Sequence, residues 1–350
     1  MSMSLSNSLI REDLEAIAEH MWLLEPLRGQ HLLLTGGTGF FGKWLLALCD
    51  LLNEHGWALR VTVVSRDPAT FLRQEPIYRS RAWLRWIASP LETLPLQMLE
   101  VDYLLHAATD TSAAGQADGI ALLDGIYQGT RRVLELSARG GVKRVLLTGS
   151  GAQYGASDAA RGYHREVCAT ACSSSDVRHV YGEAKRVQEM LGALYAQRYG
   201  FEVLFTRCFA FVGAGLPLDG HFAIGNFIRD ALAGACIRLN SAGTALRSYL
   251  YGADLAVWLL GILASGRAGG IYNVGSDQAL SILELARRVI DLLAPDLEVH
   301  ARGTSGQELR QVYVPDLANA RELGLDIWTA LDRAILRTAA WHLQARGAVV

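Results

Sequence analysis

The chain has 350 residues, which exceeds the ~100 to 200 residues of one typical domain and allows either one large core or two unequal ones. Half of the residues are apolar, and the formal net charge is only -2, so the chain has no broad electropositive field and nucleic acid is not expected as a main partner. The five cysteines include no CxxC pair, which argues against a disulfide framework or a metal site and fits a reducing cytoplasm.

The N-terminus reads MSMSLSNSLIREDLEAIAEH, which predicts a polar lead into an amphipathic helix and lacks the apolar core of a signal peptide. The longest apolar run, 255–264, is shorter than the ~20 residues that cross a bilayer, so we expect no membrane contact.

From residue 31 onward, compact apolar runs alternate with helix-favouring stretches. Strands are expected at 31–34, 59–65, 101–107, 144–148 and 202–209, and helices at 43–52, 119–139 and 177–199. This alternation predicts an α/β fold of the Rossmann type, with a doubly wound parallel sheet covered by helices on both faces. Residues 65–100 contain no clean strand pattern.

A glycine-rich turn, TGGTGFFG at 35–42, lies between the first expected strand and the first expected helix of this sheet. Its glycines permit a tight turn, close approach of a pyrophosphate and packing of helix on strand, while the helix N-terminus supplies amide donors. The turn predicts a dinucleotide site, and the expected contacts are Gly36, Thr38, Gly39, Phe40, Phe41 and Gly42.

The second expected strand ends in Ser65, Arg66 and Asp67, where dinucleotide-binding folds usually place an acid that accepts the ribose hydroxyls. A serine followed by an arginine can instead donate to a 2'-phosphate. NADP(H) is therefore favoured as the cofactor. NAD(H) is the alternative if Arg66 is a surface residue and Asp67 turns toward the ribose.

Beyond residue 212 the pattern loosens into short strands and helices, among them a helix near 225–233, which predicts a smaller C-terminal α/β lobe that binds substrate. The expected division is an N-terminal helical extension at 1–28, a dinucleotide-binding domain at 29–212 to which 245–276 returns, and a substrate lobe at 213–244 and 277–350.

Three residues form a candidate acid/base set. Tyr181 and Lys185 are four residues apart, on one face of the helix expected at 177–199, where the cation can stabilise the phenolate. Ser150 follows the strand at 144–148, so it is expected at the carboxyl edge of the sheet. YxxxK alone is a common surface pattern, but together with Ser150 it suits proton transfer during a hydride transfer.

With these motifs the chain resembles the extended short-chain dehydrogenase/reductases, the NAD-dependent epimerase/dehydratase family that modifies nucleotide sugars. The matching segments are TGGTGFFG, LLHAA at 104–108, TGSGAQYG at 148–155, YGEAK at 181–185, RSYLYGADLA at 247–256, YNVGS at 272–276 and PDLANARELG at 315–324. The resemblance implies that Ser150, Tyr181 and Lys185 are the catalytic triad and that Tyr181 and Lys185 also touch the cofactor. It further implies that Ala107 and Ala108 line the cofactor site and that Arg247 binds the diphosphate of the substrate.

The two residues after Ser150 bear on the reaction. Gly151 and Ala152 stand where the family's sugar 4,6-dehydratases carry two acids, and GDP-fucose synthase carries a cysteine at the second place. Neither residue can move a proton, so 4,6-dehydration is disfavoured. The expected activity is hydride transfer at the 4-position of a nucleotide hexose, as an epimerase or a 4-ketoreductase with Tyr181 as acid/base. A non-catalytic dinucleotide-binding regulator is the alternative from another class, and the intact triad argues against it.

The substrate contacts follow less directly from the resemblance, because Ala210 replaces an asparagine that many relatives use near the substrate phosphate. Ser150, His221, Asn226, Arg247 and Arg310 are the candidates, and each polar side chain among them also fits a solvated loop, a helix cap or an ion pair. The family further implies a homodimer formed through the helices at 119–139 and 177–199.

Overall fold

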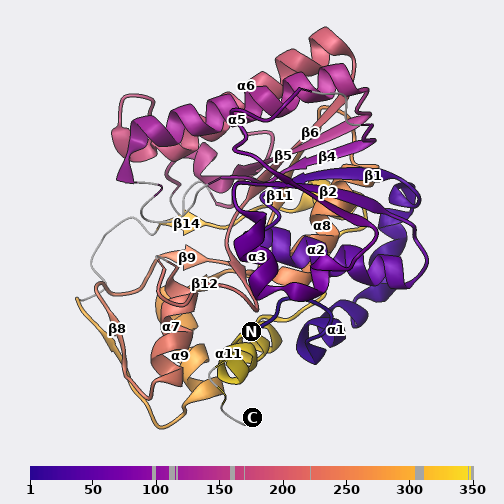
Figure 1. Cartoon of the computed structure of the whole chain (residues 1–350). Helices are drawn as coiled ribbons and strands as arrows, with labels where there is room; N and C mark the ends of the chain where they lie inside the picture. Colours follow the sequence, from indigo (N-terminus) through magenta and orange to yellow (C-terminus); the bar gives the residue numbers. More distant parts are fainter. Residues whose placement is uncertain are drawn as a thin grey trace.

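The computed structural model describes residues 1–96, 100–109, 115, 117–157, 162–168, 170–220, 222–303, 311–345 and 347. A seven-stranded sheet lies at the centre, and all of its neighbouring strands are parallel (Figure 1). The strand order is β11 (Ile271–Val274), β6 (Glu202–Cys208), β5 (Arg144–Ser150), β4 (Tyr103–His106), β1 (His31–Thr35), β2 (Arg60–Ser65) and β3 (Leu84–Ala88). The predicted α/β class with a Rossmann-type sheet is confirmed.

Helices cover both faces of this sheet, which is why the central strands are apolar over nearly their whole length. Helices α5 (Gly119–Gly140) and α6 (Val180–Tyr199) pack together on one face, above β4 and β5 in Figure 1. Helices α2 (Phe40–Glu54) and α8 (Gly252–Ser265) pack together on the other face. The parallel strands therefore direct their carboxyl ends toward one common edge.

A second group of elements lies beyond that edge (Figure 1). Its helices are α7 (Ala223–Leu232), α9 (Ile282–Leu293) and α11 (Leu331–Ala345). Its short strands are β7 (Phe211–Val212), β8 (Ile237–Leu239), β9 (Leu246–Arg247), β10 (Leu250–Tyr251), β12 (Leu280–Ser281), β13 (Val299–Ala301) and β14 (Val312–Tyr313). The short helix α10 (Ala318–Glu322) instead packs against β11, where Asn319 donates to Ile271 O. Strand β9 pairs with both β12 and β14, which brings the chain near residue 313 back toward the sheet. The expected domain boundaries stay a prediction, although β11 lies inside the range expected to return to the sheet.

The structure corrects the interpretation of residues 65–100. They contain α3 (Pro68–Gln74), a 3-10 helix η2 (Pro76–Arg79) and the edge strand β3, which pairs with β2. The strand was missed because it is only partly buried and alternates Arg85 with large apolar residues. The N-terminal segment likewise forms two helices, α1 (Ser8–Glu15) and the 3-10 helix η1 (Ala18–Leu27), instead of one.

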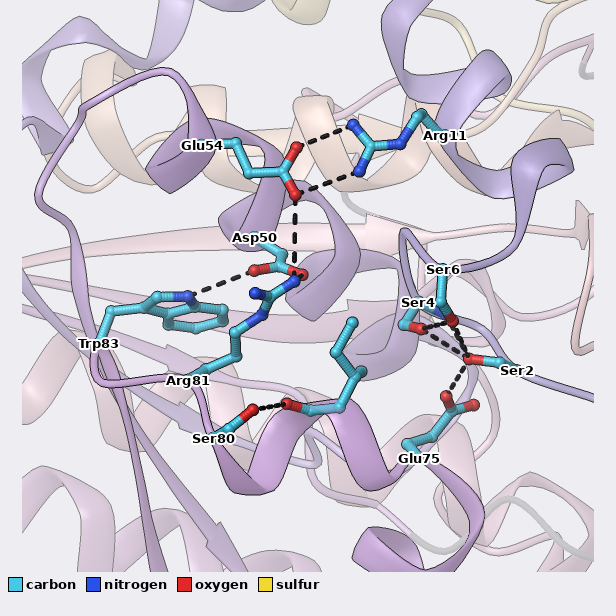
Figure 2. A network of polar contacts seen from close by, with 11 residues as sticks. Ser2, Ser4, Ser6, Arg11, Asp50, Glu54, Glu75, Ser80, Arg81 and Trp83 are labelled. Atoms are coloured by element: carbon cyan, nitrogen blue, oxygen red, sulfur yellow. Dashed lines mark hydrogen bonds and ion pairs between the residues drawn. The ribbon is translucent and has the colours of Figure 1, made fainter.

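Polar contacts attach this N-terminal segment to the β2–β3 connection, and they attach that connection to α2 (Figure 2). Glu75 accepts hydrogen bonds from Ser2 Oγ and from the backbone N–H of Met3. On α2, the buried carboxylate of Asp50 accepts from Arg81 Nη2 at 2.8 Å and from Trp83 Nε1 at 3.3 Å. These contacts hold the connection that begins with Ser65 and Arg66.

Within the described ranges, no helix combines the length and apolar character needed to cross a bilayer. Nor do the described His, Cys, Asp and Glu side chains form a group that could hold a metal ion.

Candidate active site

The glycine turn between β1 and α2 is packed so closely that side chains would not fit at three of its glycines, Gly36, Gly37 and Gly42. Gly36 has φ +77°, and a Cβ there would lie 2.6 Å from the carbonyl carbon of Ala107. A Cβ on Gly42 would lie 2.3 Å from the carbonyl oxygen of Gly36. The turn therefore rests against the end of β4, where Ala107 N donates to Thr35 O at 3.2 Å and Ala108 N donates to Thr35 Oγ1 at 3.3 Å.

Gly39, by contrast, has open space around its Cα. It is the exposed N-cap of α2, no side chain caps this helix end, and a Cβ on Gly39 would meet only Gly36 O, at 3.5 Å. Thr38, Phe40 and Phe41 are partly exposed around it, and the Phe41 ring is held edge-on by Phe211. Backbone donors at the start of a 15-residue helix, beside a glycine with open space, fit the pyrophosphate of a dinucleotide.

At the end of β2, Ser65 is half-buried and Arg66 is exposed. Asp67 caps α3: its Oδ1 accepts from Thr70 N at 2.9 Å, and its Oδ2 accepts from Thr70 Oγ1 at 2.5 Å. Both oxygens of this carboxylate are thus engaged locally. A turn of Asp67 toward an adenosine ribose would cost α3 its cap, which is worth about 1 kcal/mol.

The structure brings Ser150 and Tyr181 together at the carboxyl end of β5. Ser150 is buried, and its Oγ accepts from Ala152 N at 3.2 Å, which starts the 3-10 helix η3 (Gly151–Tyr154). Desolvation raises the pKa of Tyr181, and contact with the Ser150 hydroxyl opposes that rise. A phenol beside a hydroxyl at this edge can exchange a proton with a substrate oxygen.

Lys185 lies one helical turn further along α6 and is almost completely buried. Its Nζ donates to Thr109 Oγ1 and to Thr148 O, each at 2.8 Å, and to Gln188 Oε1 at 3.0 Å. Burial lowers the pKa of Lys185 to about 7. The amine therefore changes its charge near neutral pH, which suits a group that assists proton transfer.

One residue at the site was missed by the sequence analysis. Tyr313, on β14, projects over Gly151: a Cβ on Gly151 would lie 2.8 Å from Tyr313 Oη and 2.9 Å from Phe209 Cε1. Burial raises the pKa of Tyr313 to about 12, and contact with Ser150 opposes the rise. The sequence held one usable signal, since Tyr313 stands two residues before the segment PDLANARELG that carries the family resemblance.

The predicted substrate-binding residues do not all lie near Ser150. Arg247, on β9, donates to Leu246 O at 2.8 Å and lies 5.7 Å above the Tyr313 ring, so the structure brings it toward Ser150. Asn226 lies on α7, where its Oδ1 accepts from Arg229 Nη1 at 3.3 Å. That contact ties it to its own helix. His221 and Arg310 lie outside the described residues.

Comparison with known proteins identifies a family model, a relative by sequence and two similar solved structures. Residues 32–275 match the model of the NAD dependent epimerase/dehydratase family. A UDP-glucuronic acid decarboxylase from Arabidopsis thaliana is 28% identical over 302 residues, covering 83% of this chain and 82% of the relative.

Among solved structures, a dTDP-glucose 4,6-dehydratase from Streptomyces venezuelae with NAD bound is 25% identical, with a TM-score of 0.74 over 91% of this chain and 98% of that one. A UDP-N-acetylglucosamine 4-epimerase from Methanobrevibacter ruminantium is 18% identical and shares the fold, with a TM-score of 0.76 over 90% of this chain and 99% of that one.

Substitutions at a closely packed glycine of the turn and at the open Gly39 should differ in their effects on stability and on dinucleotide binding. Gly42→Ala would push a methyl group into the turn backbone, so we expect a lower melting temperature together with loss of dinucleotide binding. Gly39→Ala adds a methyl group where the free protein has room, so we expect a much smaller fall in melting temperature, from the poorer N-cap, but at least about a tenfold weaker dinucleotide. Thermal unfolding and calorimetric titration measure both quantities. Parent-like affinity in Gly39→Ala would contradict a pyrophosphate at this turn.

Proposed function

The chain belongs to the NAD dependent epimerase/dehydratase family, and we propose that it catalyses hydride transfer at the 4-position of a nucleotide-activated hexose. It would do so as an epimerase or a 4-ketoreductase, with Tyr181 as the acid/base. The observation that supports this most is the meeting of Tyr181 and Ser150 at the carboxyl edge of the sheet, with Lys185 buried on the same helix. The glycine turn lies at the same edge, at the end of the neighbouring strands β1 and β4.

In this proposal the protein moves one proton while hydride moves at the adjacent carbon. A bound nicotinamide would accept or supply the hydride. In the oxidising direction, the 4-hydroxyl of the sugar gives its proton to the Tyr181 phenolate, and Ser150 donates a hydrogen bond to the same sugar oxygen. A protonated Lys185 favours the phenolate, because a nearby cation stabilises the charged form of a phenol. In the reducing direction each transfer is reversed.

The surroundings of Ser150 argue against a dehydration step. Elimination of water from the oxidised ring needs a base and an acid that reach neighbouring carbons. Gly151 and Ala152 supply neither, and the space above Gly151 is filled by Tyr313.

A second candidate reaction is favoured by the decarboxylase among the relatives. Oxidation at the 4-position of a nucleotide-activated hexuronate gives a β-keto acid, which can lose CO2 without a carboxylate base at positions 151 and 152. The enolate that remains takes a proton from water at the 5-carbon, and return of the hydride to the 4-carbon then gives a pentose. This reaction would use the same Tyr181 step. It differs from the main proposal in its substrate, a uronate, and in its product, a pentose.

Tyr181→Phe tests the acid/base assignment. The change removes the hydroxyl and keeps the ring, so turnover should fall about a hundredfold or more while dinucleotide affinity is largely retained. Steady-state rates with nucleotide hexoses and calorimetric titration of the dinucleotide measure the two effects. Tyr163→Phe, an exposed tyrosine before α6, is the matched control and should keep full turnover. A Tyr181→Phe variant with near-normal rates would show that another group moves the proton.

The proposal includes NADP(H) as the preferred cofactor, and the end of β2 supports it. Asp67 is engaged as the cap of α3, so no acid is presented where a 2'-phosphate would lie, and Arg66 is on the surface beside Ser65. A guanidinium offers paired donors to a phosphate and a flat face to an adenine.

We therefore expect NADPH to bind more tightly than NADH by roughly ten to a hundredfold, the value of one charge-assisted contact. Arg66→Ala should remove most of that difference and leave NADH affinity nearly unchanged. Calorimetric titration of both cofactors into both proteins measures it, and Arg73→Ala on α3 serves as the control for a general loss of positive charge. Equal affinities in the parent protein would overturn the preference.

The proposal also includes a homodimer through α5 and α6. Ile120, Leu123 and Tyr127 form an exposed apolar stripe at helical spacing on α5. Val187, Met190 and Leu194 repeat the same spacing on α6. Ile120 is 84% exposed and Met190 is 62% exposed, and paired apolar stripes on two adjacent helices favour a second copy of the same pair.

Light scattering at micromolar concentration should thus give twice the 38.1 kDa mass of the chain. Met190→Lys should give a monomer, because a two-fold interface brings the new charge in twice. Leu336→Lys, at an exposed leucine on α11, is the control and should remain dimeric. A monomeric parent protein would exclude this interface.

A further inference from the structure

Gln188 accepts a hydrogen bond from the Lys185 amine, and its side chain is completely buried. It follows Tyr181 and Lys185 on one face of α6, at positions i, i+4 and i+7. A buried primary amide has four hydrogen-bonding positions to satisfy, so its presence beside a buried amine requires defined partners.

The partners of Gln188 determine which way its amide points. Its Nε2 donates to Thr148 O at 2.9 Å, the same carbonyl that accepts from Lys185 Nζ. Its Oε1 accepts from Lys185 Nζ at 3.0 Å and from Thr130 Oγ1 at 3.4 Å. A reversed amide would set an N–H group against the amine and an oxygen against the carbonyl.

A second row of contacts supports the same orientation. Thr35 Oγ1 and His106 Nδ1 are 2.7 Å apart, and His106 Nε2 lies 3.5 Å from Thr130 Oγ1. Burial lowers the pKa of His106 to about 3, so the ring is neutral and carries one proton. With that proton on Nε2, Thr35 donates to His106, His106 donates to Thr130, and Thr130 donates to Gln188 Oε1. The chain of donors runs from the glycine turn to the amide oxygen that faces Lys185.

We propose that Gln188 is a positioning residue that holds the Lys185 amine against the Thr148 carbonyl, one helical turn from Tyr181, and sets how readily that amine carries a proton. The inference deepens the proposed function and rests on it for its catalytic meaning. Among the described residues, Lys185 has three hydrogen-bond acceptors, all of them neutral, and Tyr181 is not one of them.

In the described part of the chain, few charged or titratable groups surround Lys185, so the Gln188 carbonyl has a large share in stabilising the protonated amine. Cys208 on β6 favours the protonated amine slightly, the neutral His106 lies on β4, and Tyr181 lies one turn away on α6. Desolvation is the dominant effect and lowers the pKa of Lys185 to about 7. Since no carboxylate accepts from Nζ among the described residues, the dipole of the Gln188 carbonyl is one of three that hold a proton there.

The titration of the Lys185 amine can be measured directly, because the protein has only three lysines: Lys43, Lys143 and Lys185. In protein labelled with lysine that carries ¹³C at the ε-carbon, three NMR signals should report three separate titrations. Lys143 is exposed and paired with Asp102, which raises its pKa, and burial lowers the pKa of Lys43. These two lysines serve as internal references, and a Lys143→Arg variant assigns one of them.

Gln188→Met keeps the size of the side chain and removes the acceptor, so Lys185 should titrate about one pH unit lower than in the parent protein. Gln188→Glu places a carboxylate at the same distance, so Lys185 should titrate at least about one unit higher. Gln197→Met, at an exposed glutamine on the same helix, should move none of the three signals. If one of the Gln188 variants does not fold, the sign of the shift in the other decides alone.

The same variants should shift the alkaline limb of the kcat/KM pH profile in the same two directions, whereas a merely structural role would lower rates without moving the limb. An unchanged Lys185 titration in a folded Gln188 variant would overturn the inference. The NMR titration needs no substrate. A failure of the proposed reaction would appear as absent turnover with the titration shifts intact, and the two failures are therefore distinguishable.

Discussion

The close approach of α6 to the end of β5 is the constraint on which the candidate site depends, because it buries the Lys185 amine against the Thr148 carbonyl. Small residues on the helix make it possible. A Cβ on Gly182 would lie 2.7 Å from Ala152 O, and a Cβ on Gly192 would lie 2.7 Å from side-chain carbons of Leu147 and Phe205. Larger residues at these positions would push the helix outward, and Tyr181 and Lys185 would move away from Ser150 with it.

The same approach explains why a lysine can be buried here. An isolated buried ammonium is strongly disfavoured, and the protein offsets this with three close acceptors. The offset is partial, so the pKa of Lys185 falls to about 7. The packing of α6 against the end of β5 therefore sets a chemical property of the site, the pKa of Lys185.

Much of this was predictable from the sequence because it depends on local patterns. Continuous apolar runs predicted the buried strands, the turn at 35–42 predicted the glycine cradle, and spacing placed Tyr181 and Lys185 on one face. What was missed depends on contacts between distant segments. The edge strand β3 has no continuous apolar run, and Tyr313 reaches Gly151 only because β14 pairs with β9. Gln188 could not be distinguished by sequence from a solvated helix residue.

The relatives differ in the reactions that their names give, so membership of the family does not by itself fix the chemistry of this chain. The residues around Ser150 do more to separate the reactions. Gly151 and Ala152 have no acid, and Tyr313 fills the space above Gly151. These two features are why we propose a proton transfer at the oxygen bonded to the 4-carbon.

Proton NMR of the products formed in deuterium oxide tests this claim most directly. The enzyme, with NAD(P)H or NAD(P), would be incubated with nucleotide hexoses, a nucleotide hexuronate and a nucleotide 4-keto-6-deoxyhexose. We expect inversion or reduction at the 4-carbon, with no solvent deuterium at the 3-, 5- or 6-carbon. A 4-keto-6-deoxy product, or deuterium at the 5-carbon of a recovered hexose, would contradict it.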